Sequence, residues 1–415
     1  MNQEKIMNIK RLLVVVILAT SMGVAQAKTE TLDNYVEKLA EHPQVTQILE
    51  QSTRFKELSV GEMGLPDPQL IIGVDNVPID NLGFDRFLPT SKVLGFRQQI
   101  PSHSLRKARS GKQEALSKRQ QLMADYTRKR LEAILISQLI ELDKVKTLGK
   151  LANQQLGYYQ LMEYDLEGQL EAGKPVYGRF SEIDVERTEV EQRLNDLKAE
   201  RIAVEEDLIR LVGEVPEVEL PSVLNAEWNR EAEILYPVRI ASEDINVASK
   251  DVDAADAAFG PSYSIQAIYK QREDGPNFSG DDWFSIQATI SIPLWYGSNQ
   301  KPKLRAAQAG KRSAEFAYDD TRREWIRRMS VLKSERDIAL DNIELLKEKR
   351  ASLKQIVESA NRNYESGNAP LETVLDAQID ELTIESQLAT MRSRHTRLSA
   401  QFNSHIIGGN HNEND

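Results

Sequence analysis

The stretch Leu135–Tyr159, LISQLIELDKVKTLGKLANQQLGYY, decides the fold of this chain. Its apolar residues recur at steps of three or four, at Leu135, Leu139, Leu142, Val145, Leu148, Ala152, Leu156 and Tyr159. Such a narrow stripe is typical of a helix that packs against other helices over a long distance. The surrounding residues 105–171 are therefore predicted to form one helix, a rod of roughly 100 Å at 1.5 Å per residue.

The same pattern occurs a second time in the chain. Residues 303–365 carry a similar stripe, at Ile343, Leu346, Leu353, Val357, Ala360 and Tyr364. Ile100-Pro101 matches Ile292-Pro293, and Glu171-Ala172-Gly173 matches Glu365-Ser366-Gly367. The sequence therefore predicts two structural repeats, residues 28–214 and 215–406.

Each predicted repeat has the same elements in the same order. A first helix (Leu32–Glu62 or Glu231–Ala258) is followed by a β-hairpin, the long helix, a glycine turn and a closing helix (Ser181–Val212 or Leu371–Ile406). The two shorter helices together are about as long as the long helix, so they can lie end to end beside it. This predicts a mostly α-helical fold in which antiparallel helices build a wall and not a compact core.

Four segments alternate apolar and polar side chains over nine or ten residues, and they form the predicted hairpins 69–100 and 262–292. In the last strand, Ile286, Ala288 and Ile290 alternate with Gln287 and Thr289. This suits transmembrane β-strands, although a small soluble sheet alternates in the same way. Four strands cannot close a barrel alone, so closure in lipid needs several chains. We expect an interfacial aromatic girdle at Tyr263, Tyr269 and Trp283.

The N-terminus predicts export. Lys5, Lys10 and Arg11 precede the apolar run Leu12–Ala19, and Ala25-Gln26-Ala27 is a small-x-small cleavage pattern. Residues 1–27 are therefore predicted to be a cleavable signal peptide, and no later apolar run approaches the length of a spanning helix.

Composition excludes several function classes. The chain has no cysteine, which excludes disulfides and thiolate chemistry, and its net charge of −11 argues against nucleic acid as a partner. The five histidines are scattered without metal-ligand spacing, so we expect neither a metal site nor a cofactor. Each histidine is expected to be solvated: His42, His103, His395, His405 and His411. Residues 407–415 are predicted to be a disordered tail.

The sequence resembles the TolC-like family of outer-membrane efflux proteins over about Thr31–Phe402. Two pairs of segments carry the resemblance: ISIPLWYG (290–297) with KLRAA (303–307), and YESG (364–367) with LETVLDAQ (371–378). Two further segments, GLPDP (64–68) and GVDNVP (73–78), are similar to the heavy-metal branch of CzcC-like and CusC-like channels. Those relatives often carry a lipidated cysteine, which this chain lacks.

The resemblance implies a homotrimer with a 12-stranded β-barrel in outer-membrane lipid and a large periplasmic portion. It implies an exit duct and not an enzyme, working with a periplasmic adaptor (membrane fusion protein) and an inner-membrane RND-type pump. Heavy-metal cations are the substrate that the metal branch implies, and drugs or secreted proteins are the alternatives within the family. A periplasmic coiled-coil scaffold with a soluble sheet cap is the alternative class.

The candidate functional residues lie at the turns and junctions. Gly173 and Gly367 can adopt positive φ and end the long helices. The resemblance implies that this end is the periplasmic tip, where an adaptor docks and the pore narrows.

Asp184 and Asp376 occupy corresponding places in the following helices and are the candidates for the pore aperture, with solvated helix surface as the alternative. Ala369 stands where some family members have a constriction-forming arginine. Pro101 and Pro293 mark the strand-to-helix junctions.

Overall fold

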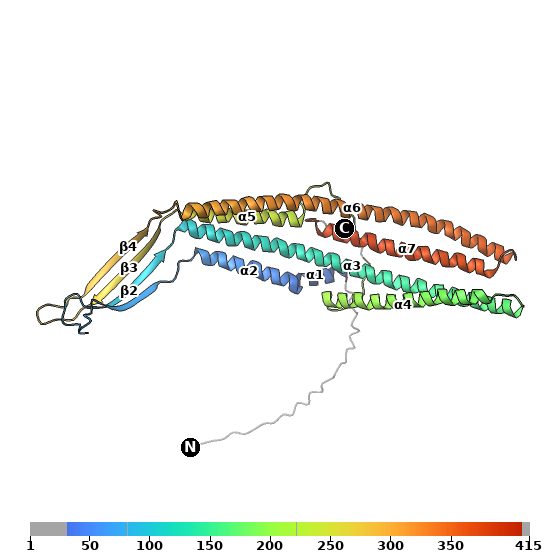
Figure 1. Ribbon diagram of the computed structural model, residues 1–415, viewed down its shortest axis with the longest axis horizontal. Helices are drawn as coiled ribbons and strands as arrows, with labels where there is room; N and C mark the ends of the chain where they lie inside the picture. The colour runs from blue at the N-terminus through green and yellow to red at the C-terminus, as the bar shows by residue number, and fades with distance from the viewer. Residues whose placement is uncertain (1–30, 81, 221, 409–415) are drawn as a thin grey trace, which may run out of the picture.

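The computed structural model describes residues 31–80, 82–220 and 222–408. The predicted signal peptide lies outside the described residues, as do residues 409–415 of the predicted tail. The molecule is elongated, with a small sheet at one end and long helices over the remaining length (Figure 1). This confirms the predicted class, a mostly helical chain with four strands.

Two long helices determine the length of the molecule. Helix α3 spans His103–Glu171 and helix α6 spans Gln300–Glu365, which are 69 and 66 residues. Each is about 100 Å long at 1.5 Å per residue. Both helices begin two or three residues before the predicted position and end at the predicted residue. In the part of the chain that the structure describes, no helix has the length and apolar character needed to cross a membrane.

Shorter helices complete a wall that is one helix thick. Helices α2 (Pro43–Met63) and α4 (Tyr177–Val212) lie one after the other along α3. Helices α5 (Tyr236–Ala257) and α7 (Leu371–Ser404) lie between α3 and α6 (Figure 1). The order across this helix wall is α6, then α5 with α7, then α3, then α2 with α4. The wall therefore has two edges, α6 on one side and α2 with α4 on the other.

The single helix predicted over Leu32–Glu62 is wrong, because the chain breaks before Pro43. Helix α1 covers Leu32–Lys38, a 3-10 turn covers Leu39–Glu41, and α2 begins at Pro43. Proline disfavours helical backbone in the residue before it, and His42 is extended with ψ of 137°. The His42 side chain accepts a hydrogen bond from the backbone N–H of Gln44, which caps the new helix.

Three other helix ends differ from the predicted ones by two to five residues. Helix α5 begins at Tyr236 instead of residue 231, because Pro237 is suited to the first turn of a helix. Helix α4 begins at Tyr177 instead of residue 181, and its first turn packs Phe180 against an apolar cluster. Helix α7 ends at Ser404, where the backbone begins to bond with the start of α5: the carbonyl of His405 accepts from the N–H of Tyr236.

All four strands form one antiparallel sheet in the order β1-β2-β3-β4. Their bounds are Gln69–Asp75 (β1), Ser91–Ile100 (β2), Ser262–Gln271 (β3) and Trp283–Ser291 (β4). Pairing between β2 and β3 joins the two predicted hairpins. Strands β1 and β4 are the edges of the sheet, and each keeps one side that no described strand pairs with.

The strand register places most apolar side chains on one face. Ala288 lies opposite Ile265, and Ile286 lies opposite Ala267. Directly opposite residues share a face, and every second residue along a strand returns to it. We call this surface the apolar face; it carries Leu70, Ile72, Val74, Leu94, Phe96, Ile100, Tyr263, Ile265, Ala267, Tyr269, Phe284, Ile286, Ala288 and Ile290.

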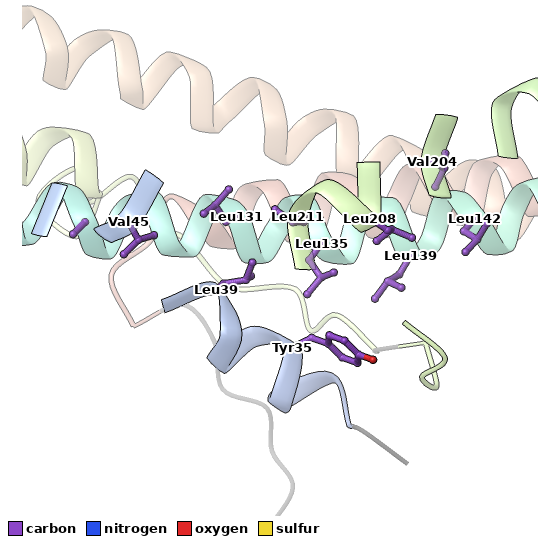
Figure 2. Packing of buried hydrophobic residues seen from close by; sticks show 11 residues of the cluster. Tyr35, Leu39, Val45, Leu131, Leu135, Leu139, Leu142, Val204, Leu208 and Leu211 are labelled. Atoms are coloured by element: carbon purple, nitrogen blue, oxygen red, sulfur yellow. The ribbon is translucent and has the colours of Figure 1, made fainter. Parts of the chain in front are cut away.

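Separate apolar clusters, and not one central core, hold the helix wall together. The largest surrounds Leu135, whose side chain is 0% exposed, and joins α1, α2, α3 and α4 (Figure 2). Most of the predicted stripe on α3 is buried, as expected. The stripe on α6 is buried at Ile343 and Ala360, whereas Tyr364 is exposed. The difference follows from position, because α3 has neighbours on both sides and α6 is an edge of the wall.

An ion-pair network ties α3, α4 and α7 together halfway along the wall. Glu141 of α3 accepts hydrogen bonds from Lys144, Arg397 and Ser393 at 2.5, 2.9 and 3.1 Å. Lys144 also donates to Glu200 of α4 at 2.9 Å. Burial favours the neutral form of Glu141, but the hydrogen bonds and charges of Lys144 and Arg397 outweigh it and lower its pKa to about 2.

Glu141→Gln is expected to lower the free energy of unfolding at pH 7 by about 1.5–3 kcal/mol, the range for hydrogen bonds to charged groups. A lowered pKa means that the stabilisation is present above the unfolded value of 4.5 and is lost as the pH falls toward 2. The variant should therefore be less sensitive to acid in this window. Unfolding midpoints measured against pH by circular dichroism check this.

Glu344→Gln, which breaks an exposed pair with Lys347, is the control and should change the unfolding midpoint little. Identical pH profiles for the wild type and Glu141→Gln would contradict the assignment.

Candidate aperture and transmembrane sheet

Two turns with the same hydrogen bonds end the long helices at the end of the wall away from the sheet (Figure 1). After α3, the N–H of Gly173 bonds to Leu170 and that of Lys174 to Gln169, at 2.9 and 3.0 Å. After α6, the N–H of Gly367 bonds to Tyr364 at 2.9 Å, and the next residue bonds to Asn363 at 2.8 Å. Both are Schellman caps.

The two glycines have φ of 83° and 75°, a backbone conformation that favours glycine. The sequence signal for these turns was therefore local and strong. Whether an adaptor docks there stays a prediction.

Asp376 lies in a cluster of charges that joins the two halves of the tip. Arg179 of α4 contacts Glu372 of α7 at 2.5 Å and Asp376 of α7 at 3.6 Å. The same guanidinium contacts Glu182 and Glu186 of its own helix at 3.2 and 3.3 Å. We call these five residues the tip cluster. It sets four carboxylates around one cation, so it carries an excess of negative charge.

The electrostatics of the tip cluster shift the titration of Asp376. Partial burial is the largest cause and raises the pKa of Asp376; Arg179 lowers it, and the carboxylates of Glu372, Glu186 and Asp380 raise it further. The net pKa is raised, chiefly by burial and further by the crowding of these carboxylates. A cation bound close to these carboxylates would reduce the repulsion between their charges.

Asp184 lies in a different environment from Asp376. Its side chain is 64% exposed and pairs with Arg187 of the same helix at 2.6 Å. No hydrogen bond or ion pair joins Asp184 to Asp376 within residues 31–80, 82–220 and 222–408. The two aspartates that correspond in sequence are therefore not brought together within one chain, and the pore role of each stays a prediction.

Arg179 is the functional candidate that the sequence analysis missed. The predicted start of α4 at residue 181 left Arg179 outside the helix, so its alignment with Glu182 and Glu186 was not apparent. Starting the helix at Tyr177 places both carboxylates on the same side, three and seven residues later. Some family members have a constriction-forming arginine at the position of Ala369 in this chain. Arg179 provides a cation at the same end of the helix wall.

The strand-to-helix junctions differ from each other. Pro101 lies one residue after β2 and two residues before α3 begins. Pro293 lies two residues after β4, but α6 begins only at Gln300, after a turn in which Leu294, Trp295 and Tyr296 are exposed. The second junction therefore presents an apolar surface that the first does not.

The apolar face of the sheet is not covered by other described residues of the chain. Ile72 is 75% exposed and Ile286 is 70% exposed, although both are apolar. The other face of the sheet is polar and includes Arg97, Gln266 and Gln287. The Arg97 guanidinium donates two hydrogen bonds to Gln266, at 2.6 and 2.9 Å. A large exposed apolar patch marks contact with lipid or with another protein.

Two of the three aromatic residues predicted for the girdle lie on the apolar face, and the third lies on the other face. Tyr263 and Tyr269 lie near the two ends of β3 on the apolar face. Trp283 pairs with Lys270 and therefore lies on the other face, where its ring stacks under Arg272 at 4.1 Å. Phe284 takes the apolar position instead.

Two histidines are not solvated as expected. His405 is buried between Tyr126 and Trp325, and Nε2 of His395 is buried without a hydrogen-bond partner. His103 is exposed, and His411 lies outside the described residues. Among the described residues, no three or more histidine, aspartate or glutamate side chains are arranged to hold a metal ion.

Comparison with known proteins relates this geometry to a family. Residues 238–403, from α5 to the end of α7, match the family described as outer membrane efflux protein. This part of the chain is therefore an outer membrane efflux protein domain. Members of this family are transport channels of the outer membrane with a periplasmic part, and not enzymes. No curated protein matches the chain closely enough to count as a relative.

Solved structures of outer membrane channels have the same fold as this chain. The outer membrane protein VceC of Vibrio cholerae has a TM-score of 0.71 at 16% identity, covering 91% of this chain and 95% of VceC. The MtrE channel of Neisseria gonorrhoeae has a TM-score of 0.73 at 14% identity, covering 90% of this chain and 88% of MtrE. CusC, described as forming a transmembrane channel, has a TM-score of 0.73 at 14% identity, covering 90% of this chain and 91% of CusC. CusC and MtrE are equally similar, so this likeness does not distinguish a heavy-metal branch.

Proposed function

We propose that three copies of this efflux protein form the outer-membrane exit duct of a tripartite efflux system. The duct would receive its substrate from a periplasmic adaptor and an inner-membrane RND-type pump. The observation that carries the proposal is the exposed apolar face, which covers all four strands at one end of a wall about 100 Å long. In a bilayer this face would contact hydrocarbon and the polar face would line water.

The edges of the sheet support a ring of chains. Strands β1 and β4 each keep an unpaired side, and unpaired strand edges are not tolerated in lipid. Pairing β4 of one chain with β1 of the next would close the sheet. Three chains would give the twelve strands that the family resemblance implies.

The edges of the helix wall support the same ring. Both edges have exposed apolar residues: Leu345, Ile338 and Ile356 on α6, and Val60, Val185 and Ile202 on α2 and α4. A contact between two different edges is heterologous and generates a ring when the rotation closes. One rotation would then close the sheet and the wall together, which gives a continuous duct.

The tip cluster is proposed to lie at the narrow end of this duct. Three copies of Asp376 around one axis would attract cations and bind divalent ions that obstruct current. Asp376→Asn is expected to lower cation selectivity and to relieve divalent block from the periplasmic side. Single-channel recording in planar bilayers measures both, with Asp320→Asn on the exposed surface of α6 as control. An intact trimer in which neither quantity changes would place Asp376 outside the pore.

Fractionation and conductance test the proposed duct against the scaffold alternative. The duct predicts that the protein is recovered with the outer membrane and gives discrete conductance steps in planar bilayers. A periplasmic scaffold predicts recovery in the soluble periplasmic fraction and no conductance. Heavy-metal cations stay a prediction from the resemblance, and drugs or secreted proteins remain the alternatives. The docking of an adaptor at Gly173 and Gly367 is a proposal of the same kind.

A further inference from the structure

A groove of about 950 Å³ lies where α5 and α7 meet end to end, between α3 and α6. All four helices contribute to its lining. Its polar and aromatic lining residues include Tyr126, Arg130, Trp325, Arg328 and His405. The volume lies within the range of sites that bind small molecules.

Four aromatic rings contact one another along this groove, and we call them the shelf: Tyr126, Tyr236, Trp325 and His405. Tyr126 of α3 stacks on Tyr236 of α5, with ring centroids 5.4 Å apart and planes at 19°. The ring of His405 lies 5.8 Å from Tyr126 and 4.8 Å from Trp325 of α6. A hydrogen bond of 2.9 Å joins the Tyr126 hydroxyl to Nδ1 of His405. Contacts from three helices and the end of α7 therefore hold the rings in place.

Two guanidinium groups lie over the shelf. Arg130 lies 5.8 Å from the centroid of Tyr126, and Arg328 lies 5.3 Å from that of Trp325. Arg328 is paired with Glu324 at 2.6 Å, whereas no carboxylate of the described residues pairs with Arg130. Burial first, and then both arginines, lower the pKa of His405 to about 4, so this histidine is neutral at pH 7. The lining of the groove is therefore positive: it contains no carboxylate, and of these two arginines Arg130 is the one without a paired carboxylate among the described residues.

His405 provides a further polar group at the shelf. Its side chain is 8% exposed, and no partner of Nε2 is found among the residues that the structure describes. When the Tyr126 hydroxyl donates to Nδ1, the proton of the neutral ring lies on Nε2. That N–H would be able to donate a hydrogen bond to an acceptor on a molecule bound in the groove.

The groove opens on the side of the wall away from the linker, residues 213–220 and 222–235, which joins α4 to α5. On α7, Ser399 and Asn403 bond to the linker, whereas Arg397 and Gln401 line the groove. Positions two apart on a helix differ by about 200° and point to nearly opposite sides. In the proposed ring, a segment that crosses the inside would narrow the duct, which favours the arrangement with the linker outside and the groove inside.

We propose that this groove binds aromatic anions, flat ring systems that carry a carboxylate or sulfonate, as they pass along the duct. The passage, though not the binding, rests on the proposed function. The shelf of Tyr126 and Trp325 would stack on the ring system, and Arg130 and Arg328 would pair with the anionic group. Apolar side chains complete the site: Met123, Ile134, Ile240, Val331 and Leu332. Small metal cations would be repelled here.

Calorimetric titration of the full protein, held in amphipol, with 1-naphthoate tests the site. The double variant Arg130→Gln, Arg328→Gln is expected to weaken binding by at least about tenfold, the effect of losing one charge-assisted contact. The matched control is Arg128→Gln, Arg323→Gln, which removes two exposed arginines of the same helices that do not line the groove. The control should bind 1-naphthoate as the wild type does. The neutral 1-naphthalenemethanol should bind more weakly, and equally to both double variants.

Equal 1-naphthoate affinity in the two double variants, or no binding by the wild type at millimolar concentration, would overturn the site. Conductance of the same preparation in planar bilayers separates this failure from failure of the duct. Channels without 1-naphthoate binding would overturn the groove and leave the duct. Binding without channels would overturn the duct and with it the proposed passage of the anion.

Discussion

Ala288→Arg is expected to abolish assembly of the channel. Ala288 lies in the middle of β4 on the apolar face, opposite Ile265, where the proposed barrel meets hydrocarbon. An arginine near the bilayer midplane costs about 2–4 kcal/mol, and each trimer would contain three of them. The yield of folded trimer in outer membranes, resolved by heat-modifiable electrophoresis, measures the loss.

Gln287→Arg provides the matched control for this substitution. Gln287 is the neighbouring residue, but it lies on the polar face opposite Gln266, where the charge would face water. Its yield of folded trimer should remain near that of the wild type. Equal yields from the two variants would show that the faces of the sheet are assigned wrongly.

Leu135→Ala is expected to cost about 2–5 kcal/mol of folding free energy, the range for removing a buried leucine side chain. Leu135 is 0% exposed and lies in the cluster where α3 meets the shorter helices (Figure 2). The midpoint of denaturant unfolding, followed by the helical circular dichroism signal, measures the change.

Leu161→Ala is the control for the core substitution, because Leu161 lies on the same helix and is 50% exposed. It should shift the unfolding free energy by no more than about 0.5 kcal/mol. Similar shifts for the two variants would mean that the stripe on α3 does not carry the packing of the wall.

The elements of this fold were predictable because their signals are long and periodic. The stripe on α3 repeats over many turns, so its burial on one side follows from helix geometry alone. The four strands alternate strongly enough that Ile286, Ala288 and Ile290 fell on one face, as the register places them. The glycines at the helix ends, Gly173 and Gly367, needed only local backbone chemistry to be located.

The features that were missed depend on capping or on residues distant in sequence. The break before Pro43 depends on a proline and a histidine cap within an apolar pattern that otherwise suits one helix. Trp283 is an exception, because it lies three residues before Ile286 and alternation along β4 alone places it on the other face. Arg179 meets Glu372 and Asp376 from more than 190 residues away, so their meeting required the arrangement of both hairpins.

The central claim, that three chains close one duct, is tested most directly by the mass of the protein extracted from outer membranes in detergent. Light scattering with the detergent contribution removed gives the protein mass of the particle. The proposed duct predicts a single species of three processed chains, with the strand signal in circular dichroism intact. A monodisperse single chain that keeps the strand signal would contradict the claim, because the sheet edges at β1 and β4 would then remain unpaired.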